Sequence, residues 1–199
     1  MSFTAPKSFD YEKHPAGTFA ARCYQVVDLG THYNDRWAKS SHLVRIVFET
    51  TKKMKDGRPF SINIKVTLSM HEKATLRKYL ESWRGKAFTS AEADNFDLEK
   101  LIGKCALLTI THSEDGEFAN ITGVSMMPEG MPEPQAVNEP ICYVIGSSSE
   151  ETFKRLTAKT QELILKSEEL TGTKREPTPA HMNGEQPPVS DFDTDDIPF

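Results

Sequence analysis

Cationic and aromatic side chains concentrate between residues 22 and 86, where 14 Lys and Arg stand against 6 Asp and Glu. Cations bind the phosphates of nucleic acid, and aromatic rings stack on its bases. The residues of these types that fall in loops or on the polar face of predicted strands are Tyr33, Arg36, Trp37, Lys39, Arg45, Lys52, Lys53, Lys55, Arg58 and Lys65. Together they predict a surface for single-stranded nucleic acid that reads no particular sequence.

Each of these groups also has a structural interpretation. Trp37 could instead anchor its loop in the core. The run from Lys52 to Arg58 could be an ordinary solvated turn. An RNA-binding protein would need the same chemistry, so these residues leave DNA and RNA as alternatives.

Charge is divided unevenly along the chain. Residues 1–127 hold 18 Lys and Arg against 15 Asp and Glu, a net charge of +3. Residues 128–199 hold 6 against 14, a net charge of −8, and the two halves sum to the overall −5. A basic body followed by an acidic end keeps nucleic-acid binding open despite the negative total.

The cysteines and the apolar residues predict a cytoplasmic protein. Cys23, Cys105 and Cys142 are odd in number and far apart, which favours reduced thiols. No apolar run approaches the roughly 18 residues that a membrane-spanning helix needs, so we expect no membrane partner.

Strands are predicted over residues 17–29, 43–49 and 60–68, with a long loop over 31–41 and a hairpin turn at Asp56-Gly57. In the first strand, Val27 and Leu29 are expected on the same face as Cys23. In the third, every even position from Phe60 to Leu68 is apolar, which predicts one face in the core and one in solvent.

Helices and two further strands follow. Ser69 and Glu72 form a capping-box pattern before an amphipathic helix that ends at Gly85, and Thr89 and Glu92 repeat the pattern. Residues 106–112 and 117–126 read as a second hairpin. Beyond residue 127 we expect a short strand over 141–145 and one helix over 149–170, docked on the body or on a second subunit.

The order of three strands, a helix and two strands predicts a mainly β fold, a five-stranded OB-fold barrel that binds ligands on strands 2 and 3. A sandwich or another small barrel is the alternative. The predicted divisions are the barrel in residues 1–127, an extension with a short strand and helix in 128–170, and a disordered linker with an acidic tip in 171–199.

The last residues carry a recognisable motif. They resemble the acidic tip of bacterial-type single-stranded DNA-binding proteins in Asp193, Asp195, Asp196, Ile197, Pro198 and Phe199. The body, roughly Pro15 to Val124, resembles bacteriophage-encoded proteins of this class in Asp28-Leu-Gly30 and in the segment from Leu80 to Lys86.

This resemblance implies a protein that coats single-stranded DNA in phage replication, recombination and repair, within the host bacterial cytoplasm. It also implies that the tip recruits replication or recombination proteins. The long connection before strand 4 and the added helix depart from the bacterial housekeeping type. Because of these departures, the oligomeric state of the bacterial type is not carried over to this chain. A homo-oligomer of unspecified size stays an alternative.

The remaining residues contain only partial matches to catalytic motifs. The Gly85-Lys86 pair lacks the other residues of a phosphate-binding loop, and His71-Glu72 lacks the second histidine of a zinc protease motif. We therefore predict no enzyme activity, cofactor or metal. A protein-interaction adaptor without nucleic-acid affinity and, less favoured, a metal-dependent nuclease are the alternatives.

Overall fold

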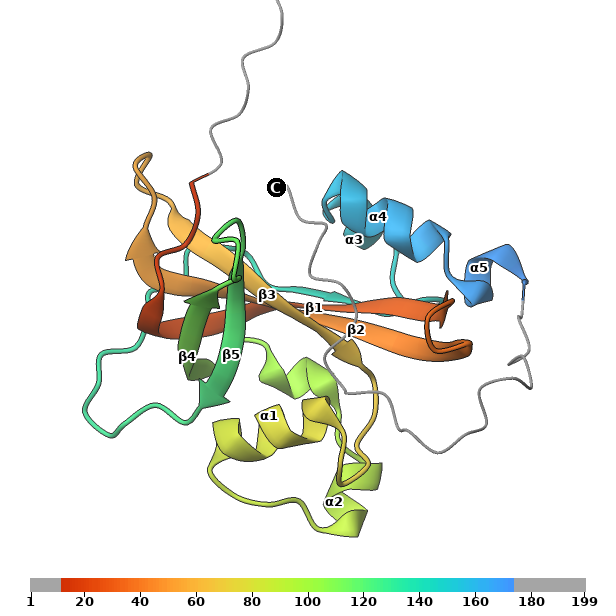
Figure 1. The fold of residues 1–199 in the computed structure, drawn as a ribbon, viewed down its shortest axis with the longest axis horizontal. Helices are drawn as coiled ribbons and strands as arrows, with labels where there is room; N and C mark the ends of the chain where they lie inside the picture. The colour runs from red at the N-terminus through yellow and green to blue at the C-terminus, as the bar shows by residue number, and fades with distance from the viewer. Residues whose placement is uncertain (1–11, 174–199) are drawn as a thin grey trace, which may run out of the picture.

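The computed structural model of the protein describes residues 12–173. Its strands are β1 Gly17–Asn34, β2 Lys39–Lys53, β3 Pro59–Thr67, β4 Cys105–His112, β5 Ala119–Ser125 and β6 Ile141–Tyr143. Its helices are α1 Thr75–Arg84, α2 Ser90–Asp94, the 3-10 helix η1 Leu98–Leu101, α3 Glu150–Lys154, α4 Ala158–Leu165 and α5 Glu168–Thr171. The fold is mainly β, as the sequence predicts (Figure 1).

β1 is the central strand of the sheet. The order is β3-β2-β1-β4-β5, all antiparallel, and β6 pairs with β1 in parallel. β4 occupies one edge of β1 as far as Arg22, and β6 takes over that edge from Gln25. Within residues 12–173 the sheet is not closed by a β3–β5 ladder and has six strands, so the predicted closed five-stranded barrel is not confirmed.

The prediction of a loop over residues 31–41 is wrong. β1 and β2 stay paired as far as Asn34 and Lys39, and only residues 35–38 form the turn. The Asn34 side chain accepts hydrogen bonds from the backbone N–H groups of Arg36 and Trp37, and Ala38 adopts a left-handed φ of 45°. The hairpin thus ends in an arm, residues 31–41, at the right of Figure 1. Its small polar residues lack the apolar alternation by which strands are predicted.

β1 also changes the face on which its side chains lie. Its register with β2 shifts between Cys23 and Gln25, which marks a β-bulge. Cys23 and Val26 consequently belong to the main core, whereas Val27 and Leu29 belong to a second core. The predicted common face for Cys23, Val27 and Leu29 is therefore wrong, because the extra residue reverses the alternation.

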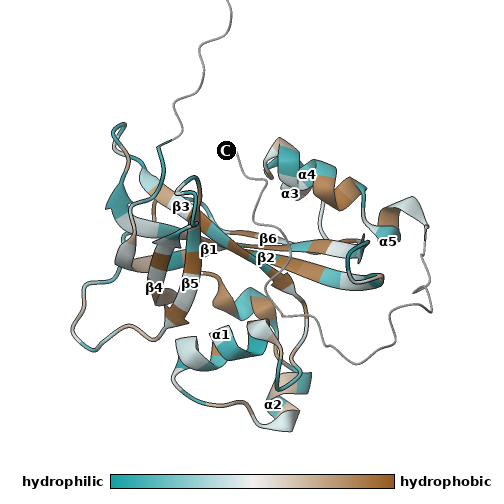
Figure 2. Ribbon diagram, in the orientation of Figure 1, coloured by the Kyte–Doolittle hydropathy of each residue, from teal (hydrophilic) through white to brown (hydrophobic). Residues whose placement is uncertain are grey.

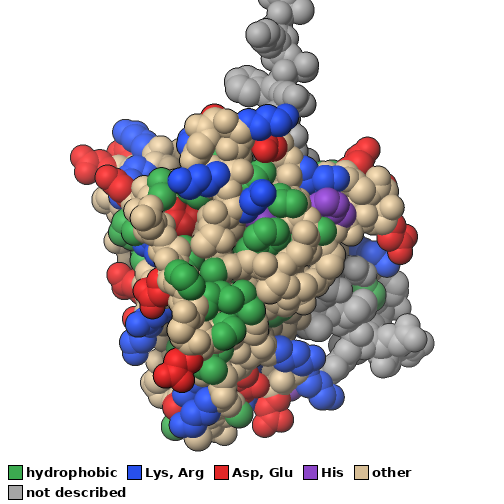
Figure 3. Space-filling view, turned by 90° about the vertical axis from the view of Figure 1, so that its left-hand side faces the viewer, with side chains coloured by type: hydrophobic (Ala, Val, Ile, Leu, Met, Phe, Trp, Pro, Cys, Tyr) green, Lys and Arg blue, Asp and Glu red, His purple; other side chains and the backbone are tan. Residues whose placement is uncertain are grey.

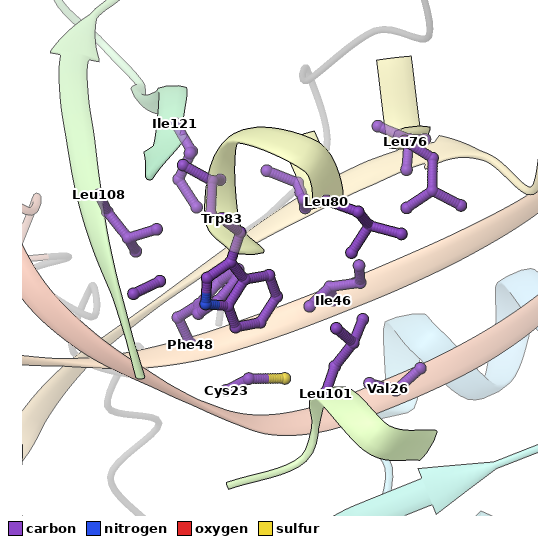
Figure 4. Packing of buried hydrophobic residues seen from close by; sticks show 14 of the residues in the cluster. Cys23, Val26, Ile46, Phe48, Leu76, Leu80, Trp83, Leu101, Leu108 and Ile121 are labelled. Carbon is purple, nitrogen blue, oxygen red and sulfur yellow. The ribbon is translucent and has the colours of Figure 1, made fainter. Parts of the chain in front are cut away.

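The main core lies between the sheet and α1. Leu76, Leu80 and Trp83 of α1 pack over Ile46 and Phe48 of β2 (Figure 4). The indole N–H of Trp83 donates to the carbonyl of Cys105 at 2.7 Å, so its one polar group is satisfied on burial.

The apolar alternation of β3 matches the structure except at its end. Phe60, Ile62, Ile64 and Val66 are buried, as predicted. Leu68 lies beyond the strand and is 39% exposed, so its predicted core position is wrong. The ladder with β2 ends at Thr67, and the chain turns away before Leu68 can follow the same face.

The first predicted capping box does not form. α1 begins at Thr75, and the Ser69 hydroxyl instead accepts from the backbone N–H of His71, two residues away. The second box does form: Thr89 and Glu92 cap α2 reciprocally. Gly85 ends α1 in the left-handed conformation, as predicted.

The extension after residue 127 docks in cis on the outer face of β1 and β2. Tyr143, Leu156 and Ile164 pack against Val27 and Leu29 in the second core. Figure 2 shows hydrophobic residues along β1 and β2, which lie between α1 and these C-terminal helices.

The single helix predicted over residues 149–170 is wrong, because three short helices take its place. Ser149, Thr157 and Ser167 stand at their N-caps in extended conformation. The Ser149 and Thr157 hydroxyls each accept a backbone N–H of the helix that follows. These caps break the chain into turns that follow the sheet.

Gly30 is the position on which this docking depends most closely. It has a φ of 78°, and an added Cβ would lie 2.5 Å from Ser167 Cβ and 2.8 Å from Ile145 Cδ1. We expect Gly30→Ala to lower the free energy of unfolding by roughly 2–5 kcal/mol, from left-handed strain and overpacking together. Urea denaturation measures this.

Gly57→Ala is the matched control, because Gly57 has a φ of 86° but no atom within 4 Å of an added Cβ. It should cost only the backbone strain, roughly 1–2 kcal/mol. Equal losses in the two variants would contradict close packing at Gly30.

Candidate nucleic-acid interface

Eight of the ten residues predicted to bind nucleic acid form two groups at opposite ends of β2. Tyr33, Arg36, Trp37 and Lys39 lie at the tip of the arm, and Lys52, Lys53, Lys55 and Arg58 lie in and beside the β2–β3 turn. A strand of 15 residues spans roughly 45–50 Å. The two groups therefore do not form a single patch (Figure 1).

At the arm tip a cation lies over an aromatic ring. The Arg36 guanidinium carbon is 5.2 Å from the centroid of the Trp37 ring, within range of a cation–π contact. Arg36 and Lys39 are exposed and Trp37 is half-buried. Trp37 belongs to neither of the two cores in the described part of the chain, which disfavours its interpretation as a core anchor.

The β2–β3 turn is the second group, and Asp56-Gly57 forms the hairpin turn predicted there. The side chains of Lys52, Lys53 and Lys55 are exposed. Arg58 is exposed too, but its Nη2 lies 2.7 Å from Asp56 Oδ2, which offsets part of its charge. Figure 3 views this end of the molecule and shows Lys and Arg side chains gathered along its upper part.

A row of polar side chains on β3 joins the two ends. Ser61, Asn63, Lys65 and Thr67 alternate with the core residues and are all half-buried on the opposite face. Alternate residues of a strand are about 6.7 Å apart, so the row is evenly spaced. It starts beside the β2–β3 turn and ends at Thr67, which pairs with Leu43 where the arm begins.

Tyr24 adds an aromatic ring to this row. It stands at the β-bulge of β1, and its hydroxyl donates to Ser61 Oγ at 3.2 Å. Burial raises the pKa of Tyr24, which keeps the phenol protonated as a donor. Sequence reasoning missed Tyr24, because only the bulge brings it across to β3.

Arg45 lies on the predicted outward face and is half-buried beside α4. Its Nη1 donates to Thr160 Oγ1 at 2.6 Å. Its Nε is buried and bonds no described residue. Burial also lowers the pKa of Arg45.

The neighbouring part of the outer face is closed by a buried ion pair. Glu49 is 1% exposed and accepts from Arg22 Nε at 2.6 Å. Asn138, from the extension, donates to the same carboxylate through its backbone N–H at 2.8 Å and its side chain at 2.7 Å. The extension therefore covers β1 and β2 here, whereas the polar row of β3 keeps its half-exposed positions.

The predicted partner-binding residues of the tip lie outside the described residues. They are Asp193, Asp195, Asp196, Ile197, Pro198 and Phe199. Their role stays a prediction.

Other chemistry is limited in residues 12–173. No group of His, Cys, Asp and Glu side chains there is arranged to hold a metal ion. Cys23 is a free, buried thiol, and burial raises its pKa to about 12, so it stays protonated. Among the helices of this range, none is both long and apolar enough to cross a bilayer.

Comparison with known proteins assigns no family. No protein-family model matches the chain, and no curated protein sequence matches it significantly.

His14 fixes the lead segment beside the basic β2–β3 turn. It is 2% exposed, and its ring lies 4.8 Å from the rings of Phe19 and Phe60. Nδ1 donates to the Pro15 carbonyl at 2.8 Å, and Nε2 lies 2.9 Å from Thr50 Oγ1. A neutral imidazole satisfies both contacts, with Nε2 accepting the hydroxyl proton.

Burial lowers the pKa of His14 from its ordinary 6.5, with nearby His112 and Lys52 acting in the same direction. The unfolded chain then binds more protons than the fold, so stability is present above the ordinary pKa and is lost as the pH falls through the lowered one. We expect the free energy of unfolding to fall as the pH drops below the ordinary histidine pKa of 6.5, and to fall less in His14→Gln. Urea titrations at several pH values measure this.

His71→Gln is the control, because His71 is exposed. It should keep the pH dependence of the unmodified protein. A similar flattening in both variants would show that His14 is not the group responsible.

Proposed function

We propose that the protein binds single-stranded DNA without sequence preference, along the outer face of β3 and both ends of the β2 hairpins. The observation that carries this is the polar row of Ser61, Asn63, Lys65 and Thr67, which joins two cationic ends. Phosphates would contact the cations, while Trp37 and Tyr24 offer rings for base stacking. RNA could use the same surface.

The arrangement favours a single strand over a duplex. The row contains one cation among neutral side chains, so it offers hydrogen bonds without a dense charge pattern. Trp37 can stack only on a base that is not paired inside a helix.

The topology is compatible with an OB-type fold. The order β3-β2-β1-β4-β5, with α1 between β3 and β4, is the order of that five-stranded barrel left open between β3 and β5. In that fold the ligand lies over strands 2 and 3, which agrees with the proposed row on β3.

We further propose that the acidic tip recruits replication or recombination proteins during phage DNA metabolism in the bacterial cytoplasm. The support is chemical: a peptide with one Phe and several carboxylates suits a grooved, basic partner.

The deciding experiment is a fluorescence-anisotropy titration of labelled single-stranded and duplex oligonucleotides at several salt concentrations. We expect preference for single strands, little dependence on base sequence and a steep loss of affinity with salt. Absence of binding in low salt would refute nucleic-acid binding and leave a protein-interaction adaptor as the function.

Trp37→Ala tests the stacking role of the arm. We expect affinity for single-stranded DNA to fall roughly 5- to 150-fold, the loss of one base–aromatic stack. Lys104→Gln is the control, because Lys104 is exposed in the turn before β4, away from the row. Unchanged affinity in Trp37→Ala would place the arm tip outside the DNA site.

Lys65→Gln tests the row itself. Losing one phosphate contact should reduce the slope of log affinity against log salt by about 0.7 for a single strand. The measurement is the same titration over a range of salt, again beside Lys104→Gln. An unchanged slope would remove Lys65 from the contact surface.

A further inference from the structure

The side chains of Arg22 and Arg77 have little exposed area, and each is paired with a carboxylate. Arg22 is held by Glu49 and by the carbonyl of Asn138. Arg77 donates to the carboxylate of Glu81 at 2.9 Å and to two backbone carbonyls. In these two cases the fold supplies an anion for the guanidinium.

Arg45 has no such carboxylate partner among the described residues. Its one hydrogen bond to a described residue goes to the neutral hydroxyl of Thr160, and its Nε bonds none of residues 12–173. Lys65 stands directly opposite on β3, so its cross-strand neighbour is also a cation. Arg45 is half-buried with its Nε out of contact with water, and an anion would offset the free energy that this partial burial costs.

Two threonine hydroxyls lie beside Arg45. Thr160 Oγ1 accepts from Arg45 and lies 2.8 Å from Thr157 Oγ1, and either hydroxyl can donate in that contact. Thr157 Oγ1 also accepts the backbone N–H of Thr160 at 3.4 Å. The contact uses one of the two hydroxyl protons, so the other is left to donate, and Thr157 is exposed.

We propose that Arg45, Thr157 and Thr160 form a binding site for one phosphate group, between β2 and the start of α4. Its tetrahedral oxygens accept from a guanidinium and a hydroxyl at once, and the guanidinium fork suits phosphate better than an ammonium does. The ligand is inorganic phosphate or a phosphate of the nucleic-acid backbone. The second source rests on the proposed function, because Arg45 adjoins Lys65 in the β3 row.

Thermal unfolding of the full chain tests the site. The midpoint Tm is measured in sodium phosphate and in sodium chloride at equal ionic strength, so that general screening cancels. We expect phosphate to raise Tm by about 2–4 °C in the unmodified protein and in Lys104→Gln, and not in Arg45→Gln. No rise in the unmodified protein, or an equal rise in Arg45→Gln, would overturn the proposal.

Arg45→Met keeps the test decisive if Arg45→Gln does not fold. A flexible apolar side chain in place of a half-buried cation that bonds no described carboxylate should fold at least as well. It should likewise show no phosphate-dependent rise in Tm, and a rise equal to that of the unmodified protein would count against the site.

A competition experiment separates the two sources of phosphate. If the backbone of DNA uses the site, inorganic phosphate at constant ionic strength should weaken single-stranded DNA binding in the unmodified protein but not in Arg45→Gln. A rise in Tm without competition assigns the site to free phosphate. Single-stranded DNA binding in chloride alone reports on the proposed function separately, so either proposal can fail without the other.

Discussion

β1 has to contribute side chains to two cores, and the rest of the structure depends on how it does so. At the bulge after Cys23 the strand exchanges β4 for β6 along one edge. The backbone of Cys23 is satisfied there by the η1–β4 turn, since its N–H donates to Lys104 O and its carbonyl accepts from Gly103 N. Without this shift, Val27 and Leu29 would face α1, and the second core would lose both side chains.

The docked extension covers part of the sheet and leaves the rest accessible to a ligand. It uses the outer face of β1 and β2 for apolar packing, for the Arg22–Glu49 network and for the contact with Arg45. β3 pairs with β2 on one side and is the edge strand of the order β3-β2-β1-β4-β5. Its outward residues are consequently the ones left half-exposed, although their composition alone would not single them out.

Local sequence patterns correctly predicted the elements that depend only on neighbouring residues. The β3 alternation, Asp56-Gly57 and the Gly85 helix end are of this kind, because each depends on a few neighbouring residues. The faces of Val27 and Leu29 could not be predicted, because a bulge has no reliable residue signature. The strands of the arm could not be predicted either, because a two-stranded ribbon with no apolar core on either face shows no apolar alternation.

For the candidate site, too, the types of residue could be predicted from the sequence, but their positions relative to one another could not. Sequence identified the cationic and aromatic residue types, but whether they share a patch depends on how far β2 continues without a break. Because β2 runs unbroken from Lys39 to Lys53, the two groups stand at its ends. A compact ligand could touch one group only. A ligand that engages both must be extended and flexible enough to follow the twisted strand, and an unpaired nucleic-acid strand has this property where a stiff duplex does not.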